Sequence, residues 1–317
     1  MGYKQSNPIH NFKFSIKNIE FIKEDEIKKP INNLFGLKNG KLLANSNNEI
    51  LLLKSDTFEI LFYLILPQEP QEILEIKNNN ILFGLYHKIL IYEIFLNELH
   101  FVNSFNTYPK LYGDLISIIE LKYNQFNLIS YSYDAKILFW KRNKNNNYII
   151  QTIISIDDNY NNIEPQNLIE LKNKKEIVFQ NNISLYFYNT INFECKIIEN
   201  ITGGRHCIVQ ANKNILLLAG NLYIYLINLN TYELIKGIRD IGVCGNIFKL
   251  FDKTFILKKY YGEYKRIKII KDNIIIIEKD MEIFNDIEPS SYVFIGKNRL
   301  LLTSYGNIFT FNYSNIK

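Results

Sequence analysis

Short runs of apolar residues, each followed by a polar turn and a second apolar run, recur along the chain. Three of the first runs are near copies of one another: Ile73 to Lys77, Ile118 to Lys122, and Leu168 to Lys172. The second runs follow after a turn bearing Asn or Lys, at Ile81 to Leu85, Leu128 to Ser130 and Ile177 to Phe179. Short apolar runs bounded by turn residues predict β-strands, and paired runs predict β-hairpins.

Four further segments show the same pattern with less similar residues: Leu34 to Ala44, Ile208 to Leu218, Ile247 to Leu257 and Tyr292 to Leu302. The residues that close the first runs are Leu37, Ile76, Leu121, Leu171, Ala211, Leu250 and Ile295. Their steps of 39, 45, 50, 40, 39 and 45 residues average 43. This period is typical of a four-stranded propeller blade, so the pattern predicts an all-β chain forming a single seven-bladed β-propeller.

Each unit continues with two more expected strands. Gly220-Asn221 and Gly306-Asn307 are tight-turn pairs that tolerate positive φ. The connection at Asp56 to Glu59 resembles that at Asn230 to Glu233, with a looser echo at Thr190 to Glu194. The predicted blades span about 31–66, 70–105, 113–155, 165–201, 205–240, 244–281 and 289–314.

The seventh unit ends after its third strand, and the N-terminus offers the missing one. Residues 12–21 alternate as an edge strand would, so we expect them to form the outer strand of the last blade and close the ring. Glu24 to Lys29 then reads as a charged connector. Because no Pro-, Gly- or Ser-rich linker interrupts the series, the expectation is one domain over residues 1–317.

The third unit carries a family motif. Ser130, Ser132, Asp134, Ile137 and Trp140 resemble the WD-repeat pattern of paired serines, an aspartate, an isoleucine and a terminal tryptophan. The chain therefore resembles divergent WD-repeat (WD40-like) seven-bladed propellers. The resemblance implies that the aspartate accepts hydrogen bonds across the tight turn, while serine and tryptophan tie the middle strands together.

The motif departs from the family pattern in two places. Lys141 replaces the aspartate of the Trp-Asp pair, and Asp114 stands where the family usually has histidine. Trp140 is the only tryptophan, so the specific motif covers one unit while the strand pattern covers residues 12–314. In the other units we expect apolar packing to replace the polar motif.

Composition fits this fold. Hydrophobic residues make up 47% of the 317 residues, and 22 Tyr and 22 Phe favour strands. The N-terminus lacks the apolar core of a signal peptide, and the longest apolar run, Ile60 to Leu66, is too short to cross a membrane as a helix. We expect a cytoplasmic or otherwise intracellular protein, the nucleus included.

No cofactor or metal set is expected. Cys195, Cys207 and Cys244 are widely spaced, and adjacent strand residues such as His206 and Cys207 point to opposite faces, which disfavours zinc. The three thiols are expected to be buried small hydrophobes. No nucleophile elbow, phosphate loop or zinc-protease motif is present in the sequence, so the expectation is a protein without enzymatic activity.

Polar residues precede or begin the first strand of each unit, at the mouth of the expected central channel. These rim residues are Asn33, Glu72, Asp114, Asn167, His206, Asn246 and Ser291. They are candidates for binding a protein partner. An alternative is acid–base chemistry by Glu72, Asp114 and His206, which requires these side chains to converge.

The chain's net charge of +5 is concentrated in one segment. Residues 249–279 contain nine Lys or Arg against four Asp or Glu, an excess of 9 − 4 = 5. The expected sixth-unit hairpin carries Lys258, Lys259, Lys265, Arg266 and Lys268. Basic residues among tyrosines can bind RNA, phosphoinositides or an acidic protein, or can be a solvated strand face.

Taken together, these features predict a non-enzymatic protein–protein interaction scaffold in an intracellular complex. The alternative is an anion-binding adaptor, for phosphoinositide or RNA, that acts through the basic hairpin.

Overall fold

The structure is a computed structural model of the chain. It describes residues 15–16, 19–26, 31–107, 115–122, 126–132, 136–144, 147–155, 166–172, 174–180, 184–201, 207–219, 223–239, 244–251, 254–259, 264–270, 274–278, 291–295, 299–304 and 307–313. These residues contain strands and turns and no helix, so none of them forms a helix that could span a membrane. The all-β prediction is thus confirmed.

The strands pair into antiparallel sheets, numbered here in chain order. The first sheet contains β3 (Asn33–Gly36), β4 (Leu42–Ser46), β5 (Glu49–Leu53) and β6 (Ile60–Ile65). The second contains β7 (Glu72–Glu75), β8 (Asn80–Gly84), β9 (Lys88–Phe95) and β10 (Glu98–Asn106). The third contains β11 (Leu115–Glu120), β12 (Leu128–Ser132), β13 (Lys136–Arg142) and β14 (Tyr148–Ser155).

The later sheets follow the same order of strands. The fourth contains β15 (Gln166–Glu170), β16 (Glu176–Gln180), β17 (Leu185–Asn189) and β18 (Cys195–Ile198). The fifth contains β19 (Cys207–Gln210), β20 (Ile215–Ala219), β21 (Tyr223–Asn228) and β22 (Glu233–Arg239). The sixth contains β23 (Cys244–Phe251), β24 (Thr254–Lys259), β25 (Tyr264–Ile270) and β26 (Ile274–Glu278). The predicted four-stranded antiparallel sheets are therefore confirmed.

The seventh sheet includes strands from the N-terminal part of the chain. β27 (Ser291–Ile295), β28 (Arg299–Ser304) and β29 (Asn307–Tyr313) are extended by β2 (Ile19–Glu26), which pairs with β29, and by β1 (Ser15–Ile16). The outer strand thus starts and ends later than the expected 12–21, and Glu24 to Glu26 belong to it rather than to a connector. A bulge between Phe21 and Lys23 continues the pairing, and an edge strand accommodates charged residues readily.

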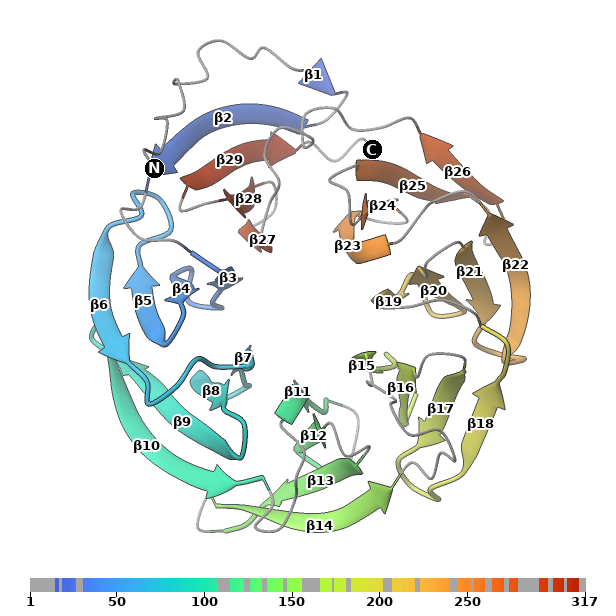
Figure 1. Cartoon of the computed structure of the whole chain (residues 1–317), viewed down its shortest axis with the longest axis horizontal. Coiled ribbons are helices and arrows are strands. Elements are labelled where there is room, and N and C mark those ends of the chain that lie inside the picture. The colour runs from blue at the N-terminus through green and yellow to red at the C-terminus, as the bar shows by residue number, and fades with distance from the viewer. Residues whose placement is uncertain are drawn as a thin grey trace, which may run out of the picture. The chain divides into compact units, whose positions relative to one another are not determined.

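The chain divides into two compact units. One comprises residues 1–46, 50–63 and 286–317, and the other residues 47–49 and 64–285. The larger unit holds the second to sixth sheets, which lie side by side with their first strands innermost (Figure 1). In it β7, β11, β15, β19 and β23 contact one another in that order. In the smaller unit β27 contacts β3.

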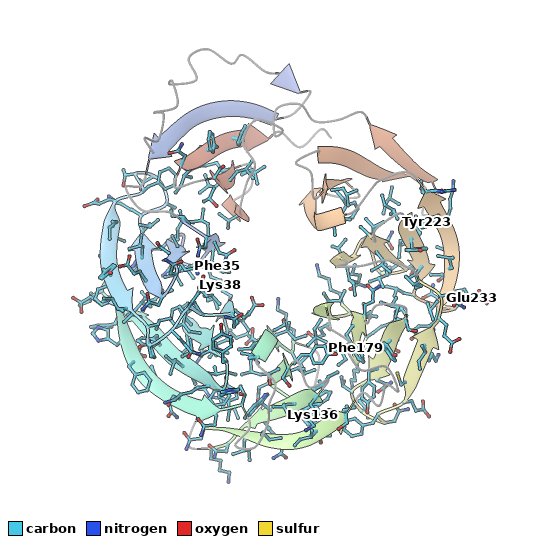
Figure 2. The ribbon with its side chains drawn as sticks, viewed as in Figure 1. Phe35, Lys38, Lys136, Phe179, Tyr223 and Glu233 are labelled. Carbon is cyan, nitrogen blue, oxygen red and sulfur yellow. The ribbon has the colours of Figure 1, made fainter. Side chains whose placement is uncertain are left out.

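Burial explains why the middle strands are uniformly apolar and the outer strands alternate. All five residues of β8, β12 and β20 are buried, and neighbouring sheets cover both faces of β12 and β20. In the outer strand β14, buried or half-buried positions alternate with exposed ones. Figure 2 shows this contrast in Phe179, which is 2% exposed in a core between sheets, and the exposed Glu233.

Apolar clusters between successive sheets form the core. The cluster between the third and fourth sheets includes Ile129, Phe139 and Phe179. The cluster between the fifth and sixth includes Phe255 and Leu257. Stacked sheets bury apolar area on both faces, which is the main stabilising contribution in such a fold.

Candidate interaction surface

The third sheet contains the one polar motif that the sequence singled out. Nε1 of Trp140 donates a hydrogen bond to Oγ of Ser130 at 2.8 Å, linking β13 to β12, and both residues are at most 2% exposed. The indole also packs edge-on against Phe105 of β10, with ring centroids 4.9 Å apart. A buried indole N–H needs a partner, so this serine is the contact that the family resemblance implies.

The second serine links the facing ends of β12 and β13. Oγ of Ser132 donates to the carbonyl oxygen of Lys136 at 3.3 Å. Asp134, to which the resemblance assigns the tight turn, lies outside the described residues. The described contacts give Ser130, Ser132 and Trp140 a structural role.

The rim residues occupy one end of the first strands. Asn33, Glu72 and Ser291 begin β3, β7 and β27, while Asn167 and Asn246 are the second and third residues of β15 and β23. Asn33 is exposed and Glu72 half-buried. Each of these residues thus lies at or near the start of the first strand of its sheet. Within each compact unit, the first strands of neighbouring sheets contact one another. Asp114 and His206 lie outside the described residues.

Glu72 is the one rim residue with a shifted acidity in the described part of the chain. Burial raises the pKa of Glu72 to about 7, and a hydrogen bond from the backbone of Ile73 opposes part of this rise. A carboxyl group that titrates near neutrality is a candidate acid or base. Its expected companions in acid–base chemistry, Asp114 and His206, are not among the residues described.

The basic hairpin of the sixth sheet is formed by β24 and β25. Their register pairs Lys258 with Tyr264, Leu257 with Lys265, and Ile256 with Arg266, while Lys268 pairs with Thr254. Lys259 is the last residue of β24. The hairpin thus brings basic positions from two strands into neighbouring rungs of one ladder.

Side chains of one sheet hold the first turn of the sheet before it, and sequence analysis missed this function. The backbone N–H of Lys77 donates to Oε1 of Glu120 at 2.8 Å, that of Lys122 to Oε2 of Glu170 at 2.7 Å, and that of Lys172 to Oε1 of Gln210 at 2.6 Å. We call these three contacts the inter-sheet hydrogen bonds. They explain why Glu120 and Glu170 precede the closing residue of the first run in the third and fourth units, and Gln210 has the same position in the fifth. The signal was the recurrence of that Glu at the repeat period.

A second recurring contact comes from the turn between the third and fourth strands. Phe58, Phe193 and Tyr232 occupy equivalent turns, each with φ between 56° and 60°, and each backbone N–H donates to the carbonyl four residues earlier. Bulky residues seldom adopt positive φ, which costs about 1–2 kcal/mol. Here the conformation carries the ring toward the preceding sheet: Phe193 lies 6.1 Å from Phe139, between ring centroids.

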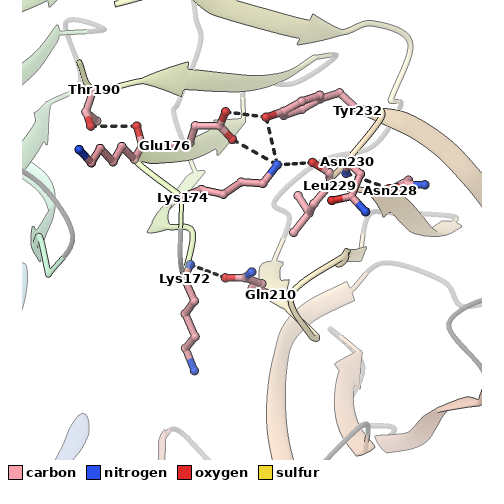
Figure 3. A network of polar contacts seen from close by, with 10 residues as sticks. Lys172, Lys174, Glu176, Thr190, Gln210, Asn228, Leu229, Asn230 and Tyr232 are labelled. Carbon is pink, nitrogen blue, oxygen red and sulfur yellow. Dashed lines mark hydrogen bonds and ion pairs between the residues drawn. The ribbon is translucent and has the colours of Figure 1, made fainter. Parts of the chain in front are cut away.

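Tyr232 forms the most extensive of these contacts (Figure 3). Its hydroxyl donates to Oε1 of Glu176 at 2.5 Å and accepts from Nζ of Lys174 at 3.1 Å, while Lys174 also donates to the carbonyl of Leu229. Nζ of Lys196 lies 4.0 Å from the ring centroid. Burial, then the bonded carboxylate of Glu176, raises the pKa of Tyr232 well above its usual range. This network connects the fourth and fifth sheets, so the role of Tyr232 is structural.

The thiols do not form a site within the described residues. Those residues contain no group of three or more His, Cys, Asp or Glu placed to hold a metal. Cys195 is exposed, which corrects the expectation of a buried thiol, because it begins the outer strand β18. Cys207 and Cys244 begin the first strands of the fifth and sixth sheets.

No protein-family model and no curated protein sequence matches this chain. Solved structures do match in fold. A chain in the crystal structure of the mitotic checkpoint complex superposes with a TM-score of 0.74 at 10% identity, covering 98% of this chain and 100% of that one. The Pan2 WD40 domain of Neurospora crassa gives 0.68 at 9% identity, over 96% and 98%.

A third match belongs to an enzyme. Streptogramin B lyase superposes with a TM-score of 0.67 at 16% identity, covering 94% of this chain and 98% of the enzyme. Identities this low establish the fold alone. With its four-stranded antiparallel sheets and the Trp140–Ser130 contact, the chain has the β-propeller fold of WD40 repeat proteins.

Proposed function

We propose that this protein is a non-enzymatic interaction scaffold, a subunit or adaptor of an intracellular protein complex, built as one closed seven-bladed propeller. The observation that carries the proposal is the fold, which it shares with a chain of the mitotic checkpoint complex and with the Pan2 WD40 domain. A propeller offers a large rigid surface to other proteins. Streptogramin B lyase shows that the same architecture can host an enzyme, so the experiment must distinguish these outcomes.

The rim residues are the proposed peptide-binding positions on this scaffold. At the same end of the inner strands, Gln180 is the last residue of β16 and pairs in register with Gln166 at the start of β15. Gln180 is 1% exposed, and neither atom of its amide has a hydrogen-bond partner among the described residues. Gln180 therefore adds a buried polar group at the same end of the inner strands as the rim residues.

The test is gentle native purification of the tagged full-length protein, followed by mass spectrometry. We expect stoichiometric companions that survive moderate salt. A clean monomer that turns over a small molecule, with loss of turnover in Glu72→Gln, would replace the scaffold by the enzyme. A clean monomer without turnover would also contradict the scaffold.

Closure of the ring by the N-terminal strand has its own test. β2 forms the outer strand against β29, so removal of residues 1–26 should expose β29 as an edge and cause aggregation or a large fall in Tm. Removal of residues 1–14 is the matched control and should leave Tm unchanged. A monomeric protein with unchanged melting after the longer deletion would contradict closure.

The register of the β24–β25 hairpin supports a second candidate, an anion-binding adaptor for phosphoinositide or RNA. Affinity for such a ligand should fall steeply with salt. Replacing Lys258, Lys259, Lys265 and Arg266 with Ala should flatten that dependence. An unchanged salt slope in the fourfold variant would remove this candidate.

A further inference from the structure

The second sheet ends in a tight hairpin whose turn has an unusual sequence. Phe95 pairs with Glu98, so only Leu96 and Asn97 connect β9 to β10. Both residues have positive φ, 49° and 84°. Two-residue turns with positive φ at both positions favour Asn-Gly or Asp-Gly, because leucine is strained in this conformation. The turn therefore retains a leucine at a position where the fold would be better served by Asn or Gly.

The strained leucine is also the most exposed large hydrophobic residue in the described chain. Leu96 is 81% exposed, its neighbour Phe95 60%, and Phe101 and Val102 on the returning strand 58% and 46%. We call Phe95 to Glu98 the hairpin tip. Single exposed apolar residues are ordinary, but the adjacent pair Phe95 and Leu96 at the end of one hairpin forms an apolar tip that favours an interaction site.

The hairpin tip differs from the equivalent turn in three other sheets. In the first, fourth and fifth sheets that turn places Phe58, Phe193 or Tyr232 at positive φ, and the ring packs onto a neighbouring sheet of the same unit. Strain there is offset by packing within the protein. At Leu96 no such burial occurs, so its side chain adds no packing within the protein and is available to a partner.

Charge around the hairpin tip indicates what covers it. Glu93 and Glu98 are both exposed beside Phe95, and Oε2 of Glu98 lies 3.4 Å from Nε2 of His100. An anionic membrane would repel these carboxylates. An apolar pocket edged by Lys or Arg is complementary to an apolar tip edged by carboxylates.

We infer that the hairpin tip inserts Leu96 and Phe95 into an apolar pocket, rimmed by basic side chains, on a partner protein. The inference rests on the proposed scaffold function and names the surface that performs it. Leu96 is the central anchor, while Glu93 and Glu98 orient the hairpin at the rim of the pocket.

The test uses a variant that should bind less while folding at least as well. Leu96→Asn removes the apolar anchor and places a residue that tolerates positive φ, so Tm should stay equal or rise. Affinity for the purified companion recovered with the wild-type protein should fall about 30-fold. Ile197→Asn is the matched control, since Ile197 is 52% exposed on the outer strand β18, and its affinity should be unchanged. Glu98→Lys should weaken binding about tenfold.

The outcomes separate this inference from the proposed function. A wild-type protein without companions overturns both. Companions bound equally by wild type and Leu96→Asn overturn the inference alone. Loss of self-association in Leu96→Asn would make a second copy the occupant, and loss of sedimentation with phosphatidylserine vesicles would make it a membrane; each contradicts the inference. A photo-crosslinker replacing Leu96 should react with an apolar segment of the companion flanked by Lys or Arg.

Discussion

The second to fifth sheets and the sixth sheet are held to their neighbours by different means. In the former, Glu120, Glu170 and Gln210 accept a hydrogen bond from the first turn of the preceding sheet. At the equivalent position the sixth sheet has Lys249. A lysine side chain has no acceptor, so it cannot make this contact with the fifth sheet. The cluster around Phe255 and Leu257 provides the apolar packing there.

We call the second to fifth sheets, which the inter-sheet hydrogen bonds connect, the polar-tied region. The junction of the fifth and sixth sheets depends on apolar packing instead. The tied region carries the hairpin tip, whereas the sixth sheet carries the basic β24–β25 hairpin. Hydrogen bonds to a carboxylate contribute about 1.5–3 kcal/mol each. We therefore expect the second to fifth sheets to form the more rigid platform, which suits a docking surface with little ordering cost.

The largest effect should follow from damage to the sixth sheet's apolar junction. Phe255 is fully buried, so Phe255→Ala should cost about 4 kcal/mol in the free energy of unfolding, through lost burial and a cavity. Chemical denaturation measures the loss. Phe255→Leu, which keeps most of the volume, should cost about 1 kcal/mol; equal losses for both variants would show that packing does not hold this junction.

Breaking one inter-sheet hydrogen bond should have a smaller effect. Glu120→Ala leaves the N–H of Lys77 without its carboxylate and should cost about 2 kcal/mol in the free energy of unfolding. Glu120→Gln keeps a neutral acceptor, as Gln210 does naturally, and should lose about half as much. If the alanine variant melts like the wild type, the inter-sheet hydrogen bonds do not stabilise the polar-tied region.

Glu72 gives the tied region a pH dependence. Its pKa in the folded protein is raised from 4.5 to about 7, so its favourable contribution is present below pH 4.5 and is lost as the pH rises to about 7. Glu72→Gln should remove this loss, and its advantage over wild type should grow by about 1.5 kcal/mol between pH 4.5 and pH 8, allowing for partial exposure. Urea titrations at both pH values measure it, and a constant difference would contradict the burial of this carboxyl group.

The smallest effect is a gain. Oε1 of Gln210 accepts from Lys172, but its Nε2 is buried without a hydrogen-bond partner among the described residues. Gln210→Glu replaces that unpaired donor with an acceptor, as in the third and fourth sheets, and should stabilise the protein by about 1 kcal/mol. Thermal melting detects the change. Destabilisation would mean that this position is too poorly solvated for a charge.

Several features of the fold followed from the sequence. The middle strands could be predicted from the sequence because burial on both faces requires continuous apolar runs, as in Ile81 to Phe83. The contact of Trp140 with Ser130 followed from the family motif. The extension of β2 through Glu26 did not, because charged residues read as a connector until their place on an edge strand is known.

The candidate surfaces were less predictable. Leu96 and Asn97 carry no turn signal, since the favoured residues for such a turn are Asn and Gly, so the hairpin tip emerged only from backbone angles and exposure. The partners in the inter-sheet hydrogen bonds lie 38 to 48 residues apart, beyond any local rule. The rim residues and the basic hairpin remain proposals.

Hydrogen exchange, measured on the free protein and on its complex with the purified companion, tests the scaffold most directly. We predict that peptides from β23–β26 exchange faster than those from β11–β18 in the free protein, and that binding protects residues 92–102. Protection confined to β24 and β25 would make the anion-binding hairpin the functional surface. Uniform exchange in the free protein, with no protection on binding, would contradict the account.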